Sequence, residues 1–206
     1  MAASLDWMKR AIQPIRQKYP DVPYTFSMDH YKEKLLADTS IPFLDFIEQH
    51  IWMSSMNDGE FNNKLGLDWN GFSADDYHRL VQKAEPLYKE NKTHWDAVLT
   101  NSIKQLAADA KAASKPLIST ECWSLVNYKD YPMLEWNWIK DLCELGVTTA
   151  AATGQWVAMA TSNFCGPQFE GMWQDVEWHQ KMTAIIKNAP IMPSVENTKI
   201  VKRFTL

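Results

Sequence analysis

PLISTECW (residues 116–123) is a short apolar run that ends in a carboxylate, a thiol and an aromatic ring. Its length and composition predict a buried strand, with Glu121 at the carboxyl end and Trp123 just beyond it. A helix is expected next, from Pro132 to Gly146, because proline favours the first helical position and glycine the position after the last. The small side chains of Val147–Thr153 then predict another strand.

Two further apolar runs upstream, Val22–Ser27 and Phe43–Trp52, also have the length of strands. A helix is predicted before them from Ser4, with turns beyond Pro14 in doubt. Two helical stretches, which begin near Ser73 and Thr93, separate the second strand from the third.

The rest of the chain predicts two long loops (54–72 and 154–174), a last helix from Val176 and an irregular tail over 190–206. Strands and helices therefore alternate, which indicates a single α/β domain over 1–206. A parallel sheet of this kind places its site at the carboxyl ends of the strands. Alternation alone leaves a doubly wound sheet and a barrel both open.

Charge and composition exclude several classes of function. The 206 residues carry a net charge of -4, without the basic stripe that a nucleic acid partner requires. The sequence has no apolar stretch of the roughly 20 residues that cross a bilayer, and no signal peptide, so we expect no membrane partner and a cytoplasmic location. GxGxxG and GxxxxGK[ST] motifs are absent, so no nucleotide cofactor is expected.

Aromatic residues are frequent, with ten Trp, seven Tyr and eight Phe. Such a density is typical of sugar platforms, but Trp rings also fill large cores, and composition does not choose between the two.

Glu121 is the strongest candidate for chemistry, because catalytic carboxylates lie at strand ends in barrels. The alternative for Glu121 is a helix cap or a lysine pair. His50 and Trp52, at the end of the second strand, suit a hydrogen bond to a carboxylate or sugar and a stacking face. Trp123, just beyond Glu121, is a further candidate for substrate binding. Asp29, at the end of the first strand, and Asn163, in the second long loop, are weaker candidates.

Other chemistries lack their motifs. The five His and three Cys show neither HExxH nor CxxC spacing, so no metal site is expected, and a GxSxG elbow is absent. Cys122 stands next to Glu121, whose charge would disfavour a thiolate. An odd number of cysteines favours free thiols.

The runs PLISTECW, TTAAATGQW, FIEQHIWM and VPYTFSM resemble the cellulase-like retaining glycoside hydrolases, which are (β/α)8 barrels. The resemblance covers about residues 20–189. It implies that these runs are, in the order given, strands seven, eight, six and five of such a barrel. It implies that Glu121 is the nucleophile, His50 the strand-six histidine and Trp156 the strand-eight aromatic at a sugar subsite.

The chain departs from this family in two places. Trp52 stands where the family usually has a tyrosine, and no Asn-Glu pair follows a strand to supply the acid/base residue. The chain therefore resembles the carboxyl-terminal half of a TIM barrel, with at most feeble hydrolysis alone. An incomplete barrel leaves sheet edges unpaired, so we expect a homo-oligomer or a separate amino-terminal half as partner.

The resemblance predicts a glycoside hydrolase-like protein that acts on or binds a saccharide. Two alternatives stay open. One is a carbohydrate-binding protein that has lost turnover, and the other is an interaction module whose aromatic residues only fill the core.

Overall fold

Four short parallel strands form the centre of the fold and lie side by side in chain order: β1 (Ser27–Met28), β2 (Ile47–Gln49), β4 (Leu117–Ser119) and β6 (Trp156–Met159). Beyond them β3 (Ile51–Trp52) pairs with β5 (Cys122–Trp123), also in parallel. The computed structural model describes residues 2–28, 41–67, 73–126, 128, 133–162, 172 and 174–204. The predicted α/β class with a parallel sheet is confirmed, and three of the four strands fall within the predicted runs or at their ends.

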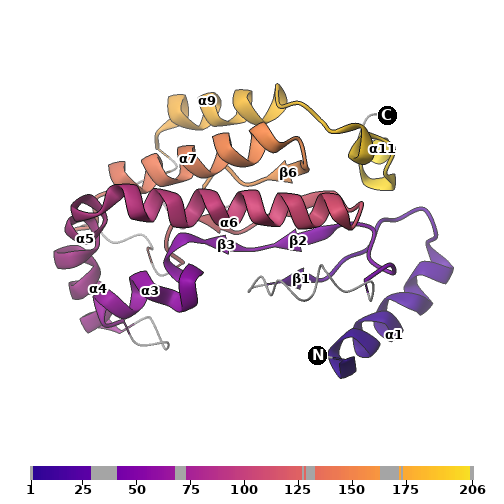
Figure 1. The fold of residues 1–206 in the computed structure, drawn as a ribbon, viewed down its shortest axis with the longest axis horizontal. Helices are drawn as coiled ribbons and strands as arrows, with labels where there is room; N and C mark the ends of the chain where they lie inside the picture. The colour runs from indigo at the N-terminus through magenta and orange to yellow at the C-terminus, as the bar shows by residue number, and fades with distance from the viewer. Residues whose placement is uncertain are drawn as a thin grey trace.

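Helices lie between β3 and β4 and between β5 and β6, and they cover the sheet (Figure 1). The helices of the chain are α1 (Ala2–Lys18), α3 (Met56–Leu65), α4 (Ala74–Arg79), α5 (Glu85–Glu90), α6 (Lys92–Ala112), α7 (Asn137–Thr153), α9 (Val176–Lys187), α10 (Pro193–Glu196) and α11 (Lys199–Phe204), with a 3-10 turn η1 (Met53–Ser55) and a π-helix η2 (Leu80–Ala84). Helix α6 runs along the strands, and α3, α4 and α5 gather at one end of the molecule.

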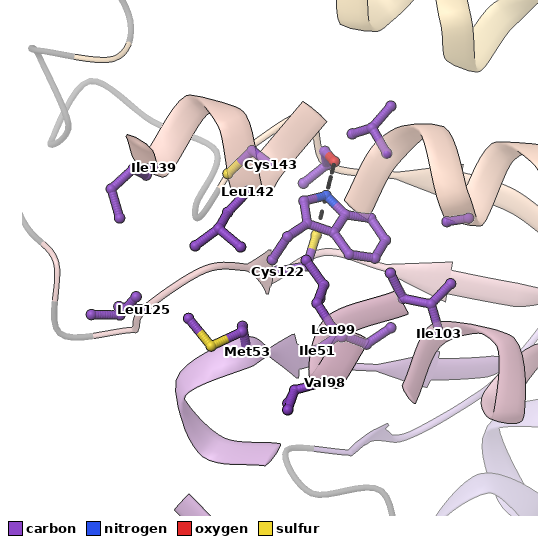
Figure 2. Packing of buried hydrophobic residues seen from close by; sticks show 14 of the residues in the cluster. Ile51, Met53, Val98, Leu99, Ile103, Cys122, Leu125, Ile139, Leu142 and Cys143 are labelled. Atoms are coloured by element: carbon purple, nitrogen blue, oxygen red, sulfur yellow. Dashed lines mark hydrogen bonds between the residues drawn. The ribbon is translucent and has the colours of Figure 1, made fainter. Parts of the chain in front are cut away.

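The main core lies between the sheet and helices α6 and α7. Figure 2 shows side chains from all three converging there: Ile51, Met53 and Cys122 from the β3 and β5 region, Val98, Leu99 and Ile103 from α6, and Ile139, Leu142 and Cys143 from α7. All of these are buried. Burial of this much apolar surface, at about 25 cal/mol per Å², is the main stabilising term of the fold.

A second, smaller cluster covers the opposite face of the sheet near the start of its strands. Val195, Ile200 and Val201 from the C-terminal segment are buried there against Phe46, Ile118 and Val157. The tail predicted to be irregular thus contains α10 and α11, so that prediction was wrong. Each of these helices is only one or two turns long, too short for a clear period in the sequence.

The prediction of a strand over Val147–Thr153 was also wrong. These residues form the last turns of α7, and the strand β6 comes after them. Val147, Ala150 and Ala151 continue the apolar spacing that begins at Leu142, and alanine is the best helix former. The helix ends at Gly154, whose φ of 69° is the left-handed value of a C-terminal cap.

Two other segments that were not predicted to be helical form helices. The expected loop 54–72 holds η1 and α3, in which Asn57, Asp58 and Gly59 take left-handed backbone angles. Helix α1 continues past Pro14 to Lys18. Arg16 anchors its end, since its guanidinium lies 2.9 Å from an Asp45 carboxylate oxygen.

Gly146 lies inside α7, at a position where any side chain would meet Trp123. A methyl group at Gly146 would lie 2.6 Å from Cγ and Cδ2 of the buried Trp123 indole. The glycine therefore permits close approach of α7 to β5, rather than marking the end of the helix as the sequence indicated.

We expect Gly146→Ala to destabilise the protein by about 1–3 kcal/mol, the usual cost of overpacking a core. Urea denaturation measures this change. In an unobstructed helix the same substitution stabilises by about 1 kcal/mol, because alanine is the better helix former. An unchanged or raised free energy of unfolding would therefore contradict the close contact.

Candidate functional site

The carboxyl ends of the central strands bring Glu121 and His50 together. Glu121 lies between β4 and β5, and His50 lies between β2 and β3. The backbone N–H of Ile51 donates to the Glu121 carbonyl oxygen at 3.1 Å, which joins the two connecting residues. Parallel pairing of β2 with β4 thus positions both side chains at the same edge of the sheet.

His50 Nδ1 lies 3.4 Å from Glu121 Oε2. The imidazole is 13% exposed and the Glu121 side chain 35%, so the ring is largely enclosed while the carboxylate reaches solvent. The structure therefore places an imidazole nitrogen beside the Glu121 carboxyl group.

Glu48 is a third member of this site, and sequence reasoning missed it. Its Oε2 lies 3.4 Å from His50 Nε2, on the other side of the ring from Glu121. Thr120 holds its other oxygen, because the backbone N–H and the hydroxyl of Thr120 donate to Glu48 Oε1 at 3.1 and 2.7 Å. The signal in the sequence was a glutamate two residues before His50 within an apolar strand, since residues two apart share one face.

Ser27, from β1, also contacts the ring. Its hydroxyl oxygen lies 2.8 Å from His50 Nε2. The site thus combines side chains from the ends of three neighbouring strands, with the imidazole between two carboxylates. Such a site can orient the Glu121 carboxyl group, which is 35% exposed, toward solvent.

Trp52, Trp123 and Trp156 were predicted to contact a saccharide, but the structure buries them. Their exposed fractions are 2%, 0% and 4%. The Trp123 indole N–H donates to the Ala160 carbonyl oxygen at 3.0 Å, and that of Trp156 to Ser119 Oγ at 3.1 Å. A ring enclosed on both faces has none left for a sugar, so their placement favours packing as their role.

The remaining predictions concern other parts of the chain. Asp29 and Asn163 lie outside the described residues. The side chains of Cys122 and Cys143 are buried. Among the described residues, no group of three or more His, Cys, Asp or Glu is arranged to hold a metal ion. None of the described helices is both long enough and apolar enough to span a membrane.

Comparison with known proteins gives one family and one solved structure. A family model described as "sugar-binding cellulase-like" matches residues 1–187. A crystal structure described as a "putative glycoside hydrolase" from Parabacteroides distasonis is 48% identical, with a TM-score of 0.92 over 97% of this chain and 54% of that chain. This chain therefore spans about half the length of that protein. No curated protein matches significantly.

The family model covers most of the chain, and the solved structure shares both its sequence and its fold. The strand ends that carry His50 and Glu121 lie within the matched residues. The chain belongs to the sugar-binding cellulase-like family.

Proposed function

We propose that this chain is a glycoside hydrolase-like domain that acts on a saccharide by a retaining mechanism, with Glu121 as the nucleophile. The observation that carries the proposal is the 3.4 Å contact between His50 Nδ1 and Glu121 Oε2 at the carboxyl ends of parallel strands. Membership of a cellulase-like family and likeness to a described glycoside hydrolase support the choice of a sugar as substrate.

In the proposed reaction, a Glu121 carboxylate oxygen attacks the anomeric carbon and the bond to the departing oxygen breaks. A general acid protonates that oxygen, and water then hydrolyses the ester between the sugar and Glu121. His50, whose Nδ1 lies 3.4 Å from Glu121 Oε2, orients the Glu121 carboxylate. We place the general acid, whose carboxyl group would lie about 5 to 5.5 Å from the nucleophile, on residues other than those of the His50–Glu121 site.

The same proposal includes the shape of the domain. Four parallel strands in chain order, with helices between β3 and β4 and between β5 and β6, suit strands five to eight of a (β/α)8 barrel. The solved relative is about twice as long as the matched part. We propose that strands from another chain, either a second copy or a separate amino-terminal half, pair with the outer strands β1 and β6 and supply the general acid.

Covalent labelling tests the nucleophile without the general acid. Dinitrophenyl β-cellobioside carries a leaving group that departs without a proton. Its analogue with fluorine in place of the hydroxyl next to the anomeric carbon slows hydrolysis of the glycosyl ester. We expect the purified chain to release one dinitrophenolate per molecule from this analogue and to gain the mass of one fluorinated cellobiosyl group. Peptide mass spectrometry should locate that group on Glu121.

A matched control is Glu60→Gln, since Glu60 also contacts a histidine, His94, at 3.0 Å, away from the strand ends. This variant should label as the unmodified protein does. Absence of any adduct, with cellobiose still bound in calorimetry, would contradict the enzyme proposal. It would support the second candidate, a non-catalytic carbohydrate-binding protein, which the "sugar-binding" description of the family favours.

A further inference from the structure

The first turn of α3 has a backbone conformation that residues with side chains rarely adopt. Asn57, Asp58 and Gly59 have φ angles of 50°, 53° and 74°, so three consecutive residues lie in the left-handed region. Glycine takes these angles without strain, whereas asparagine and aspartate take them at a cost in free energy. Two side chains are therefore held at strained positions that glycine would occupy more favourably.

A helix end does not account for this strain. Ser114, another non-glycine residue with a positive φ, of 54°, follows α6, where a single left-handed residue closes the helix. Gly66 does the same at the end of α3. Before the turn, by contrast, the 3-10 helix η1 already ends at Met56, which is extended. The left-handed pair at positions 57 and 58 thus requires another explanation.

Asn57 and Asp58 differ in what their side chains do for the turn. The Asn57 side chain forms a hydrogen bond with Glu60. Asp58 is exposed, and its carboxylate forms no hydrogen bond or ion pair within the described part of the chain. Only the main chain of Asp58 contributes to the turn, since the Asn63 amide donates to its carbonyl oxygen at 3.1 Å. A local structural role explains Asn57 but not the side chain of Asp58.

Buried contacts on both sides hold the turn in place. Gly59 is buried, and Phe61 is completely buried with its ring edge-on to Trp95, at 4.9 Å between centroids. Before the turn, the buried Ser54 donates its backbone N–H to the Ser124 carbonyl oxygen at 3.3 Å. An exposed carboxylate on a fixed turn is preorganised for binding, because little conformational entropy is lost when a ligand docks.

The turn lies at the same end of the sheet as Glu121. The backbone N–H of Ile51 donates to the Glu121 carbonyl oxygen, and three residues later Ser54 bonds in the same way to Ser124. Asp58 follows Ser54 by four residues, which limits the separation of their Cα atoms to about 15 Å. Figure 1 shows α3 beyond the end of β3. In parallel α/β sheets, the segments that follow the carboxyl ends of the strands form the binding site.

We infer that Asp58 is a binding residue for the saccharide. Its carboxylate accepts hydrogen bonds from hydroxyl groups of a sugar unit next to the one at Glu121. A carboxylate offers two acceptor oxygens, which suit the neighbouring hydroxyl groups of a sugar ring. The identity of the ligand as a saccharide rests on the proposed function, whereas the assignment of the Asp58 side chain to a ligand rather than to the fold rests on the turn itself.

Asp58→Gly and Asp58→Ala test the inference together. Both remove the carboxylate, so calorimetry should show the dissociation constant of cellotetraose rising at least about tenfold in each. Their stabilities should differ, because glycine relieves left-handed strain and alanine does not. We expect the urea midpoint of Asp58→Gly to equal or exceed that of the unmodified chain, and that of Asp58→Ala to fall below it.

Ser114→Gly is the matched control. It also replaces a left-handed residue by glycine, but Ser114 precedes β4 and so lies at the amino end of the strands, away from Glu121. Its urea midpoint should equal or exceed that of the unmodified chain, as for Asp58→Gly. The dissociation constant of cellotetraose should stay within about twofold of the original value.

An unchanged dissociation constant in Asp58→Gly would overturn the inference. A lowered urea midpoint in the same variant would also overturn it, by showing that the carboxylate stabilises the turn. If Glu121 is labelled by the fluorinated cellobioside while Asp58→Gly binds cellotetraose normally, the inference fails and the proposed function stands. If no label forms but affinity falls in both Asp58 variants, the retaining mechanism fails and the assignment of Asp58 stands. An unmodified chain that binds no cellotetraose at millimolar concentration would overturn both.

Discussion

Replacing Glu121 by glutamine is expected to lower the rate of dinitrophenolate release from dinitrophenyl β-cellobioside at least about a thousandfold. The amide keeps the size of the side chain but removes the negative charge that attacks the anomeric carbon. A loss of this size is about 4 kcal/mol of transition-state stabilisation, since each tenfold change in rate is about 1.4 kcal/mol. Spectrophotometric measurement of dinitrophenolate, with single-turnover conditions for slow variants, gives the rate.

Saccharide affinity should change far less in this variant. The Glu121 side chain is about one-third exposed and pairs with His50 rather than with a residue of the core, so the fold should tolerate glutamine. Calorimetry with cellobiose is therefore expected to give a dissociation constant within about threefold of the unmodified chain. A Glu121→Gln variant that releases dinitrophenolate at the original rate would refute Glu121 as the nucleophile and leave binding as the remaining role.

The strand ends were the most predictable part of the molecule. Glu121 and His50 each follow an apolar run, and parallel strands place their carboxyl ends at one edge, so their proximity followed from the order of the runs. The contacts that individual side chains make with one another at that edge were not predictable. Glu48 escaped notice because a glutamate inside an apolar run gives no sign that Thr120 will donate to it and that His50 will lie beside it.

The largest error in the prediction of the fold came from Gly146 and the alanines that follow it. Gly146 near the end of an apolar period has the usual appearance of a helix cap, and the alanines after it fit a small-residue strand equally well. The contact that requires a glycine there comes from Trp123, which lies 23 positions earlier in the sequence. A local pattern cannot reveal such a contact between distant segments.

The excess of tryptophan also has an explanation that composition could not provide. Buried indoles fill the space between the sheet and the helices. They are Trp52, Trp95, Trp123, Trp136, Trp138 and Trp156. Phe61 lies edge-on to Trp95 with ring centroids 4.9 Å apart, and Tyr128 does the same with Trp138 at 5.4 Å. For these rings the structure favours core packing over sugar stacking, which both remained open from the sequence.

Trp123→Ala is accordingly expected to lower the free energy of unfolding by about 3–5 kcal/mol, the usual cost of truncating a large buried aromatic side chain. The indole is completely buried, packs against Gly146 and donates to the Ala160 carbonyl oxygen at 3.0 Å. Its removal leaves a cavity and weakens the hydrogen bonding of that carbonyl group. Urea denaturation followed by far-ultraviolet circular dichroism measures the change without relying on tryptophan fluorescence.

Trp7→Ala is the matched control, because Trp7 is 57% exposed and its loss should change stability by less than about 1 kcal/mol. The pair of variants separates the two roles that the sequence allowed for Trp123. A packing residue loses stability when truncated, whereas a sugar platform loses affinity. Unchanged stability of Trp123→Ala, together with weaker cellobiose binding, would show that Trp123 contacts the ligand and would contradict its burial. A loss of several kcal/mol relative to Trp7→Ala would instead establish that Trp123 is a packing residue of the core.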